Sequence, residues 1–511
     1  DPMNTILEQY KDKINGTFFT FDRMILKGHI RPFYSPSGKK YFLSDRNVLL
    51  KDFSSYAEQV TSSIVSHTEE LAHSSGRPLR YLTSPKTSKE QTALEILKSS
   101  PVDEGLLCIL SVVEYCQTLQ PRKKEDGKLS LDTVNRKCKY YYFYFQDKTF
   151  GFMHVKLQTW FPFQIQVYIN GREMMKHVLD ANHISYRMYD NSFSEISDIQ
   201  KAQELADKFD SKSRCRQLDL FAHKVNPYLD TIEEVFHQGY HWCVDQCEFA
   251  TDVMFTSREA LEDIYPSLVG HAFYDFKCTD VFSFLGRKLD PKFLGEAVSD
   301  YRKRPEGWRI KFKMKSNSIK MYDKFNCLRI EMTINDPREF KVYREVRHRD
   351  GSTSKRWVPM GKSISNLYRY AEISRAANKR FLDSMCNVIP QRSIEKEISG
   401  ICTKKIVRGR KYTGYRVWSP ETFALFETIS DGKYLIRGFT NREIRESLYH
   451  ETAPNKQVSG KISRVFAKLR AHGLIRKVPR SRRYLVSDKG RRIMGALIET
   501  RRKIYPEFAA K

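Results

Sequence analysis

Two blocks of strand-like pattern constrain this chain most, because segments dense in aromatic and β-branched residues must pair into a sheet. The first block starts at Cys138–Phe145, which is rich in Tyr and Phe. The second starts at Tyr240–Phe255, which reads as one long strand or as a strand with a bulge. The pattern predicts further strands in these blocks at Phe152–Gln158, Phe163–Asn170, Trp308–Lys315, Ile319–Tyr322 and Leu328–Ile334.

The segment before these blocks alternates between strand-like and helix-like stretches, which indicates an α/β unit. We expect strands at Phe21–Ile30 and Gly105–Val113, and a helix at Ser88–Ser99 capped by Ser88. The fold class is therefore α/β (α+β), and a chain of 511 residues is long enough for several domains. We expect an N-terminal α/β domain at 1–135, a central β-rich domain with a candidate acidic site at 136–345, a helical region and basic linker at 346–419, and a winged helix at 420–511.

The charge of the chain is strongly positive, and a large part of the excess lies near its end. The whole chain has 88 Lys and Arg against 61 Asp and Glu, a formal charge of +27. From Thr440 to Lys511 there are 19 Lys and Arg against 6 Asp and Glu, a net charge of +13. This distribution predicts a polyanionic partner, DNA or structured RNA. A basic, solvated surface without a specific partner is the alternative.

The C-terminal segment has the order of elements that is typical of a winged helix. Helices are expected at Glu421–Ile429, Arg442–Tyr449 and Lys456–His472, and a hairpin with a basic turn follows them. In such a domain the third helix enters a major groove and the wing contacts phosphates. The residues predicted to bind nucleic acid are Lys461, Arg464, Lys468, Arg470, Arg480, Arg482 and Arg483. A winged helix that binds protein is the alternative.

Carboxylates in the second β block are candidate ligands of Mg²⁺ or Mn²⁺. In SNSIKMYDKFNCLRIEMTIND (Ser316–Asp336), a turn at Phe325-Asn326 would pair two strands and bring Asp323 and Glu331 together. Glu248 and Asp252 lie four residues apart and share one face of a regular strand. A shared divalent ion would offset their charge. Ion pairs with Arg309, Lys311 or Arg329 would offset it equally well.

The same segment resembles the YDK…RxE pattern of tyrosine-dependent rolling-circle replication initiators, such as the gene II proteins of filamentous phage and a class of plasmid initiators. Asp323, Lys324 and Glu331 match that pattern. The resemblance implies metal-dependent nicking of DNA by a tyrosine, with Asp323, Glu331 and Lys324 as catalytic residues. The chain around it, including LQTWFPFQIQVYINGRE, also resembles a large uncharacterised bacterial family that behaves like a mobile element. The nucleophile has no clear match, and Tyr343, Tyr368 and Tyr370 are candidates, with Tyr368 preferred.

Other features limit the remaining choices. The ten cysteines include no CxxC pair, which favours reduced thiols over a zinc site or disulfides. We find no signal peptide and no apolar run of membrane-spanning length, and we expect a cytoplasmic protein. Two functions stay open: a nucleic-acid-processing enzyme of a mobile element (a nickase, initiator or transposase-like protein), and a non-catalytic regulator or ribonucleoprotein subunit.

Overall fold

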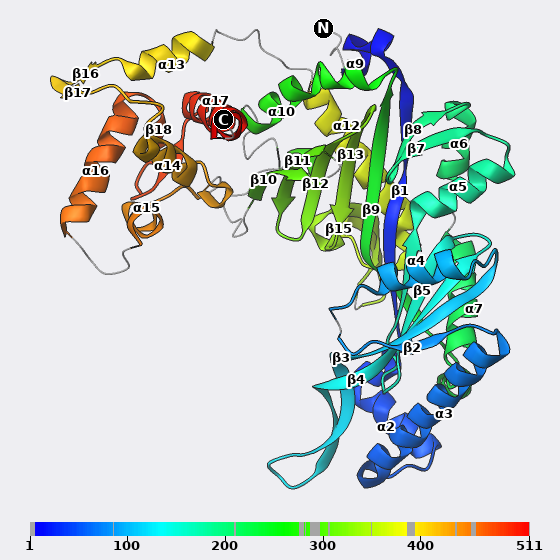
Figure 1. Ribbon diagram of the computed structural model, residues 1–511. Helices are drawn as coiled ribbons and strands as arrows, with labels where there is room; N and C mark the ends of the chain where they lie inside the picture. The colour runs from blue at the N-terminus through cyan, green and yellow to red at the C-terminus, as the bar shows by residue number, and fades with distance from the viewer. Residues whose placement is uncertain are drawn as a thin grey trace.

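One large sheet organises the chain (Figure 1). A computed structural model describes residues 6–84, 86–208, 211–274, 281, 283–286, 297–304, 307–348, 350–385, 394–434, 437–450 and 456–509. These residues form a mixed α/β structure in which 11 strands lie in the order β10-β11-β12-β13-β9-β1-β6-β5-β4-β3-β2. The pairing is antiparallel except between β2 and β3. The strands are β1 (Ile14–His29), β2 (Leu79–Tyr81), β3 (Gly105–Lys123), β4 (Leu129–Asp147), β5 (Gly151–Gln158), β6 (Ile165–Asn170), β9 (His241–Phe255), β10 (Ala297–Arg304), β11 (Gly307–Met314), β12 (Asn317–Lys324) and β13 (Cys327–Ile334).

Strand β1 lies between the two predicted β blocks and joins them. It pairs with β6 on one side and with β9 on the other. A domain boundary at 135/136 is therefore wrong for the sheet, because it falls inside β4 and the sheet continues across it. The sheet does not divide there because the first long strand of the chain is the partner that both later blocks need.

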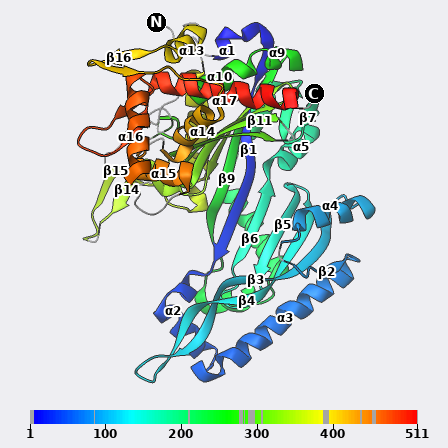
Figure 2. The same ribbon diagram turned by 60° about the vertical axis from the view of Figure 1, so that its left-hand side comes forward.

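Helices cover both faces of the sheet (Figure 2). The larger core lies between one face and α3, α7, α8 and α12. Two smaller cores lie on the other face, one under α4 and one under α5, α6 and the hairpin β7–β8. The bounds of these elements are α3 (Phe53–Ser74), α4 (Lys89–Ser99), α5 (Gly171–Ala181), α6 (Ile199–Asp207), α7 (Ser211–Val225), α8 (Leu229–Phe236), α12 (Leu367–Ser384), β7 (Tyr186–Tyr189) and β8 (Ser192–Ile196).

The C-terminal segment has a hydrophobic core of its own, which extends from Ile401 to Ile498. Its elements follow the order helix, helix, helix, hairpin, helix. They are α14 (Pro420–Ile429), α15 (Asn441–Tyr449), α16 (Lys456–Ala471), β18 (Ile475–Lys477), β19 (Tyr484–Val486) and α17 (Asp488–Ala509). Helix α17 also contacts α10 (Tyr265–Tyr274), beside the sheet.

The remaining elements are short helices and hairpins at the edges. They are α1 (Ile6–Gln9), α2 (Pro36–Asp45), α9 (Arg258–Glu262), α13 (Ile394–Cys402), β14 (Lys341–Arg347), β15 (Thr353–Pro359), β16 (Lys405–Val407) and β17 (Arg410–Tyr412). The region 346–419, where a basic linker was expected, thus contains the hairpin β16–β17. Among the described residues, no helix combines the length and the apolar composition that crossing a membrane requires.

Candidate functional site

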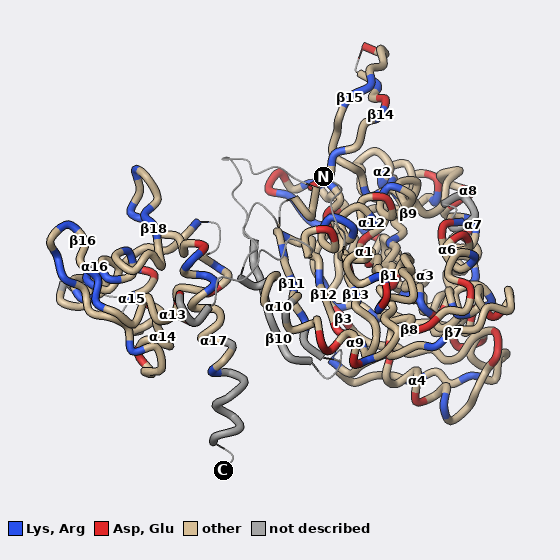
Figure 3. Tube along the Cα trace, turned by 90° about the horizontal axis from the view of Figure 1, so that it is seen from above, with Lys and Arg blue, Asp and Glu red and all other residues tan. Residues whose placement is uncertain are grey.

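The surface of the C-terminal segment is basic where α16 and the turn between β18 and β19 face solvent (Figure 3). Helix α16 places Ile462, Phe466 and Leu469 in the core. Because a helix repeats every 3.6 residues, its other side then faces outward. The predicted residues that are exposed are Lys461, Arg464, Arg470, Arg480 and Arg482. Arg476 and Lys477, which the prediction left out, are exposed beside them.

Two predicted contact residues, Lys468 and Arg483, are bound within the protein. The Nζ atom of Lys468 donates to the Gly414 carbonyl at 3.0 Å and lies 4.2 Å from the centre of the Tyr415 ring. Arg483 donates to the Gly438 carbonyl at 2.9 Å and pairs with Glu443 at 3.4 Å. Both are half-buried, so they hold the segment together rather than form part of its exposed surface.

A second basic surface lies on the hairpin β14–β15, which projects from the body of the protein (Figure 3). Arg344 and Arg356 lie directly opposite each other on paired strands, an arrangement that destabilises an isolated hairpin. Tyr343 and Trp357 also pair across the strands, with 53% and 66% of each residue exposed and ring centres 5.6 Å apart. An anionic partner would reduce the repulsion between these two arginines.

A buried cluster of charged side chains lies on the sheet face that carries β7–β8. Glu248 and Asp252 come from β9 and Glu331 comes from β13. Asp22, which sequence reasoning missed, is the extra residue of a bulge in β1: Phe21 pairs with Phe249 and Arg23 pairs with Glu248. Alternation from Thr20, which pairs with Ala250, already places Asp22 on this face, and the bulge adds Arg23 to it. Carboxylate oxygens of Asp22, Glu248 and Glu331 lie within 4.8 Å of one another, and we call these three residues the carboxylate trio.

Basic side chains occupy the space between these acids. Arg329, which is completely buried, lies 2.8 Å from Asp22, 3.1 Å from Asp252 and 3.3 Å from Glu331. The Nζ atom of Lys320 lies 2.6 Å from Glu331 and 3.6 Å from Glu248. Arg23 and Arg172 complete the set: Arg23 lies 2.8 Å from Glu248, and Arg172 lies 3.0 Å from Asp22 and 3.2 Å from Asp252. Four acids therefore face four basic side chains.

The basic side chains set the protonation of the acids. Burial opposes ionisation of Asp22 and Glu331, but Arg329 and Arg172 beside Asp22, and Lys320 and Arg329 beside Glu331, outweigh it and lower both pKa values. Burial raises the pKa of Glu248, and the negative charge of Glu331 raises it further. Glu248 is thus the member of the trio that takes up a proton most readily.

The predicted convergence of Asp323 and Glu331 is wrong. The register pairs Lys320 with Glu331 and Asp323 with Leu328. Since residues that pair directly share a face and side chains alternate along a strand, Asp323 lies on the face opposite Glu331. Lys324 lies on the face of Glu331, but its Nζ atom is 2.6 Å from Asp190 in the turn of β7–β8. Neither residue contacts the carboxylate trio.

The three tyrosine candidates do not reach the trio either. Helix α12, which carries Tyr368 and Tyr370, packs on the opposite face, where Tyr370 shares a core with Ile330 and Met332. Tyr368 is 49% exposed, and its Oη atom accepts a hydrogen bond from Arg369. Tyr343 belongs to the projecting hairpin. Tyr322 shares the face of Glu331, and burial raises its pKa to about 12, which disfavours the phenolate that a nucleophile needs.

The aromatic residues Tyr140–Phe145, within the strand predicted at Cys138–Phe145, belong to the sheet core, since all six side chains are buried. Comparison with protein-family models, with curated proteins and with solved structures finds no match for this chain. Its function therefore has to be inferred from its own charges and geometry.

Replacing Arg329 tests the cluster's energetics. Arg329→Met leaves three buried carboxylates short of a partner, and we expect the free energy of unfolding at neutral pH to fall by about 3–5 kcal/mol. The lowered pKa values of Asp22 and Glu331 contribute stability that is present above the pKa values of the unfolded chain and is lost as the pH falls through those of the folded chain. Acidification protonates the stranded carboxylates, so the deficit should narrow. Urea unfolding of the full chain at several pH values measures both effects.

The matched control is Arg187→Met, because Arg187 pairs with Glu195 at 3.6 Å on an exposed hairpin. We expect a change below about 0.5 kcal/mol for this variant. Equal losses in both variants, or a deficit for Arg329→Met that does not depend on pH, would contradict the role of Arg329 in neutralising the acids.

Proposed function

We propose that this protein binds nucleic acid through its C-terminal segment, which acts as a winged helix. The observation that carries the proposal is the exposed basic surface of α16 and the β18–β19 turn, built on a separate core. The order of three helices followed by a hairpin matches the winged-helix arrangement. Helix α16 would enter a major groove, and Arg480 and Arg482 would contact phosphates beside it.

The thermodynamic argument rests on counterion release. A duplex holds a condensed layer of cations, and each phosphate that a Lys or Arg neutralises releases some of them. Affinity then comes from charge rather than from sequence, and it falls steeply with salt. The basic hairpin β14–β15 would add phosphate contacts and an aromatic surface from Tyr343 and Trp357.

Replacing Arg480 and Arg482 by Ala should weaken duplex binding by the full chain and flatten its salt dependence. Each lost phosphate contact should reduce the slope of log affinity against log salt by about 0.9, or about 1.8 for both. Fluorescence anisotropy with a labelled duplex over a range of salt concentrations measures this slope.

The control is the pair Arg122→Ala and Arg187→Ala, which removes two exposed arginines from the sheet region. It should leave the slope unchanged. A wild-type affinity that does not vary with salt, or an equal drop in slope for both double variants, would contradict binding through the C-terminal surface.

The second candidate function is divalent-cation-dependent cutting of a nucleic-acid strand, and the carboxylate trio favours it. Carboxylate oxygens suit Mg²⁺ or Mn²⁺. Asp22, Glu248 and Glu331 would hold the ion, and the ion would supply charge stabilisation to a developing phosphoryl anion. Lys320 now lies where a cation would bind, since its Nζ atom contacts both Glu331 and Glu248. An ion would therefore have to displace the Lys320 ammonium group.

That competition gives a specific expectation. Lys320→Met should bind Mn²⁺ at least ten times more tightly than the wild-type chain, because it removes the competing charge between Glu331 and Glu248. Glu331→Gln should bind more weakly than wild type. Calorimetric titration with Mn²⁺, supported by thermal unfolding with and without the ion, measures both changes.

Asp323→Asn is the control for this experiment, because Asp323 lies on the opposite face of the sheet. Its Mn²⁺ affinity should equal that of the wild-type chain. If removing Lys320 does not tighten Mn²⁺ binding, or if Asp323→Asn weakens it as much as Glu331→Gln, the trio is a structural ion-pair cluster and strand cutting loses its support.

A further inference from the structure

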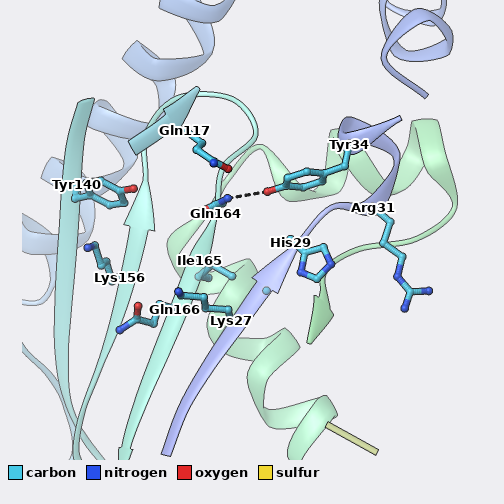
Figure 4. Close-up of a pocket in the computed structure, with 11 residues that line it drawn as sticks. Lys27, His29, Arg31, Tyr34, Gln117, Tyr140, Lys156, Gln164, Ile165 and Gln166 are labelled. Atoms are coloured by element: carbon cyan, nitrogen blue, oxygen red, sulfur yellow. Dashed lines mark hydrogen bonds between the residues drawn. The ribbon is translucent and has the colours of Figure 1, made fainter. Parts of the chain in front are cut away.

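A polar pocket of about 630 Å³ lies at the end of β1, away from the carboxylate trio (Figure 4). Lys27 and His29 come from β1, and Arg31 and Tyr34 come from the short helix that follows it, η2 (Arg31–Tyr34). Lys156 of β5 approaches from the other side. A pocket of this size is within the range that holds a small-molecule ligand.

The charges around this pocket do not balance. None of the described residues that line it is acidic. Lys27 pairs with Asp245 at 2.9 Å, and Lys156 pairs with Glu114 at 2.6 Å. Glu114 is shared, because Lys89 lies 3.2 Å from it as well. The two lysines that line the pocket are therefore paired with carboxylates outside its lining.

Arg31 pairs with no carboxylate among the residues that the structure describes. Its Nη2 atom donates to Nε2 of His241 at 2.6 Å, so the imidazole accepts and carries no charge. Burial and the positive charge of Arg31 lower the pKa values of His241 and His29, which keeps both rings neutral. His29, His241 and Cys243 could hold a metal ion by position, but Arg31 occupies one of the nitrogen atoms that a metal would need. Among the basic residues that line the pocket, Arg31 is therefore the one that no described carboxylate neutralises.

The neutral part of the lining suits a nucleoside. Gln117, Gln164 and Gln166 offer carboxamides, which both donate and accept hydrogen bonds. Gln164 donates to the Tyr34 hydroxyl at 2.8 Å, which fixes a ring that is 44% exposed at the pocket (Figure 4). An exposed aromatic ring beside fixed polar groups is a platform on which a base can stack.

We propose that this pocket binds a nucleoside 5′-phosphate, either as a free mononucleotide or as the 5′-terminal nucleotide of a single strand. A phosphate monoester has a second pKa of about 6 and carries nearly two negative charges at neutral pH, which suits a pocket lined by Arg31, Lys27 and Lys156. The Arg31 guanidinium would bind two phosphate oxygens, and Lys27 would add a point charge. The base would lie against Tyr34. This proposal does not depend on duplex binding by the C-terminal segment.

The test compares two short single strands of the same sequence, one with a 5′-phosphate and one without, on the full chain. The C-terminal surface would bind both strands almost equally, so the difference between them reports the pocket. We expect the phosphorylated strand to bind at least ten times more tightly. Arg31→Gln should abolish that difference, and Arg46→Gln, an exposed arginine outside the pocket, should preserve it.

Competition identifies the source of the phosphate. If adenosine 5′-monophosphate displaces the phosphorylated strand better than inorganic phosphate does, the pocket is a mononucleotide site. If the phosphorylated strand binds tightly but the mononucleotide displaces it only weakly, the pocket binds strand ends. The proposal would be overturned if both strands bind equally and the mononucleotide does not bind. Equally strong displacement by inorganic phosphate and the mononucleotide would also overturn it, as would a preference that Arg31→Gln leaves intact.

Discussion

The Arg329 guanidinium is the interaction on which the central sheet depends. It is completely buried on β13, yet it contacts carboxylates from β1, β9 and β13 itself. Buried charges must be paired, because an unpaired one loses its hydration without compensation. Strands β1, β9 and β13 must therefore pair in a register that places their carboxylates beside Arg329. The bulge at Asp22, the position of Arg172 on α5 and the closure of β7–β8 all serve this requirement: the Asn191 carbonyl accepts from Arg329, and the Phe193 amide donates to Asp252.

The basic side chains that stabilise the fold and those that are exposed lie in different parts of the protein. In the buried cluster, acidic and basic side chains balance. Among the described residues, exposed basic side chains lie instead on α16, on the β18–β19 turn, on the β14–β15 hairpin and at Arg31. A protein that kept its arginines only for stability would pair them with acids. Unpaired, exposed arginines on projecting elements are what a phosphate-rich partner requires.

Much of the fold could be predicted from periodicity, because most strands and helices bury one face. Helix α4 with its Ser88 cap, the strands β11, β12 and β13, and the three helices before β18 lie where the pattern placed them. That β1 joins the two β blocks could not be predicted, since strand order depends on long-range pairing. The bulge in β1 that places both Asp22 and Arg23 on one face could not be predicted either.

The error at Asp323 has a different cause. A turn at Phe325-Asn326 was expected, and Phe325 does have a positive φ of 60° there. That turn fixes Lys324 opposite Cys327, so Glu331 must lie opposite Lys320 and Asp323 must face away. The expected turn already implied this register. Lys468 and Arg483 could not be assigned in the same way, because their internal partners at Gly414 and Gly438 are set by packing.

Hydrogen exchange of the full chain with and without a nucleic-acid duplex tests the central claim most directly, because it maps protection along the backbone without any substitution. At low salt, the account predicts slower exchange in α16 and β18–β19 when duplex is present, with the effect lost at high salt and with no change in β11, β12 and β13. Protection confined to the sheet, or unchanged exchange in α16 and β18–β19 while duplex is bound, would contradict it.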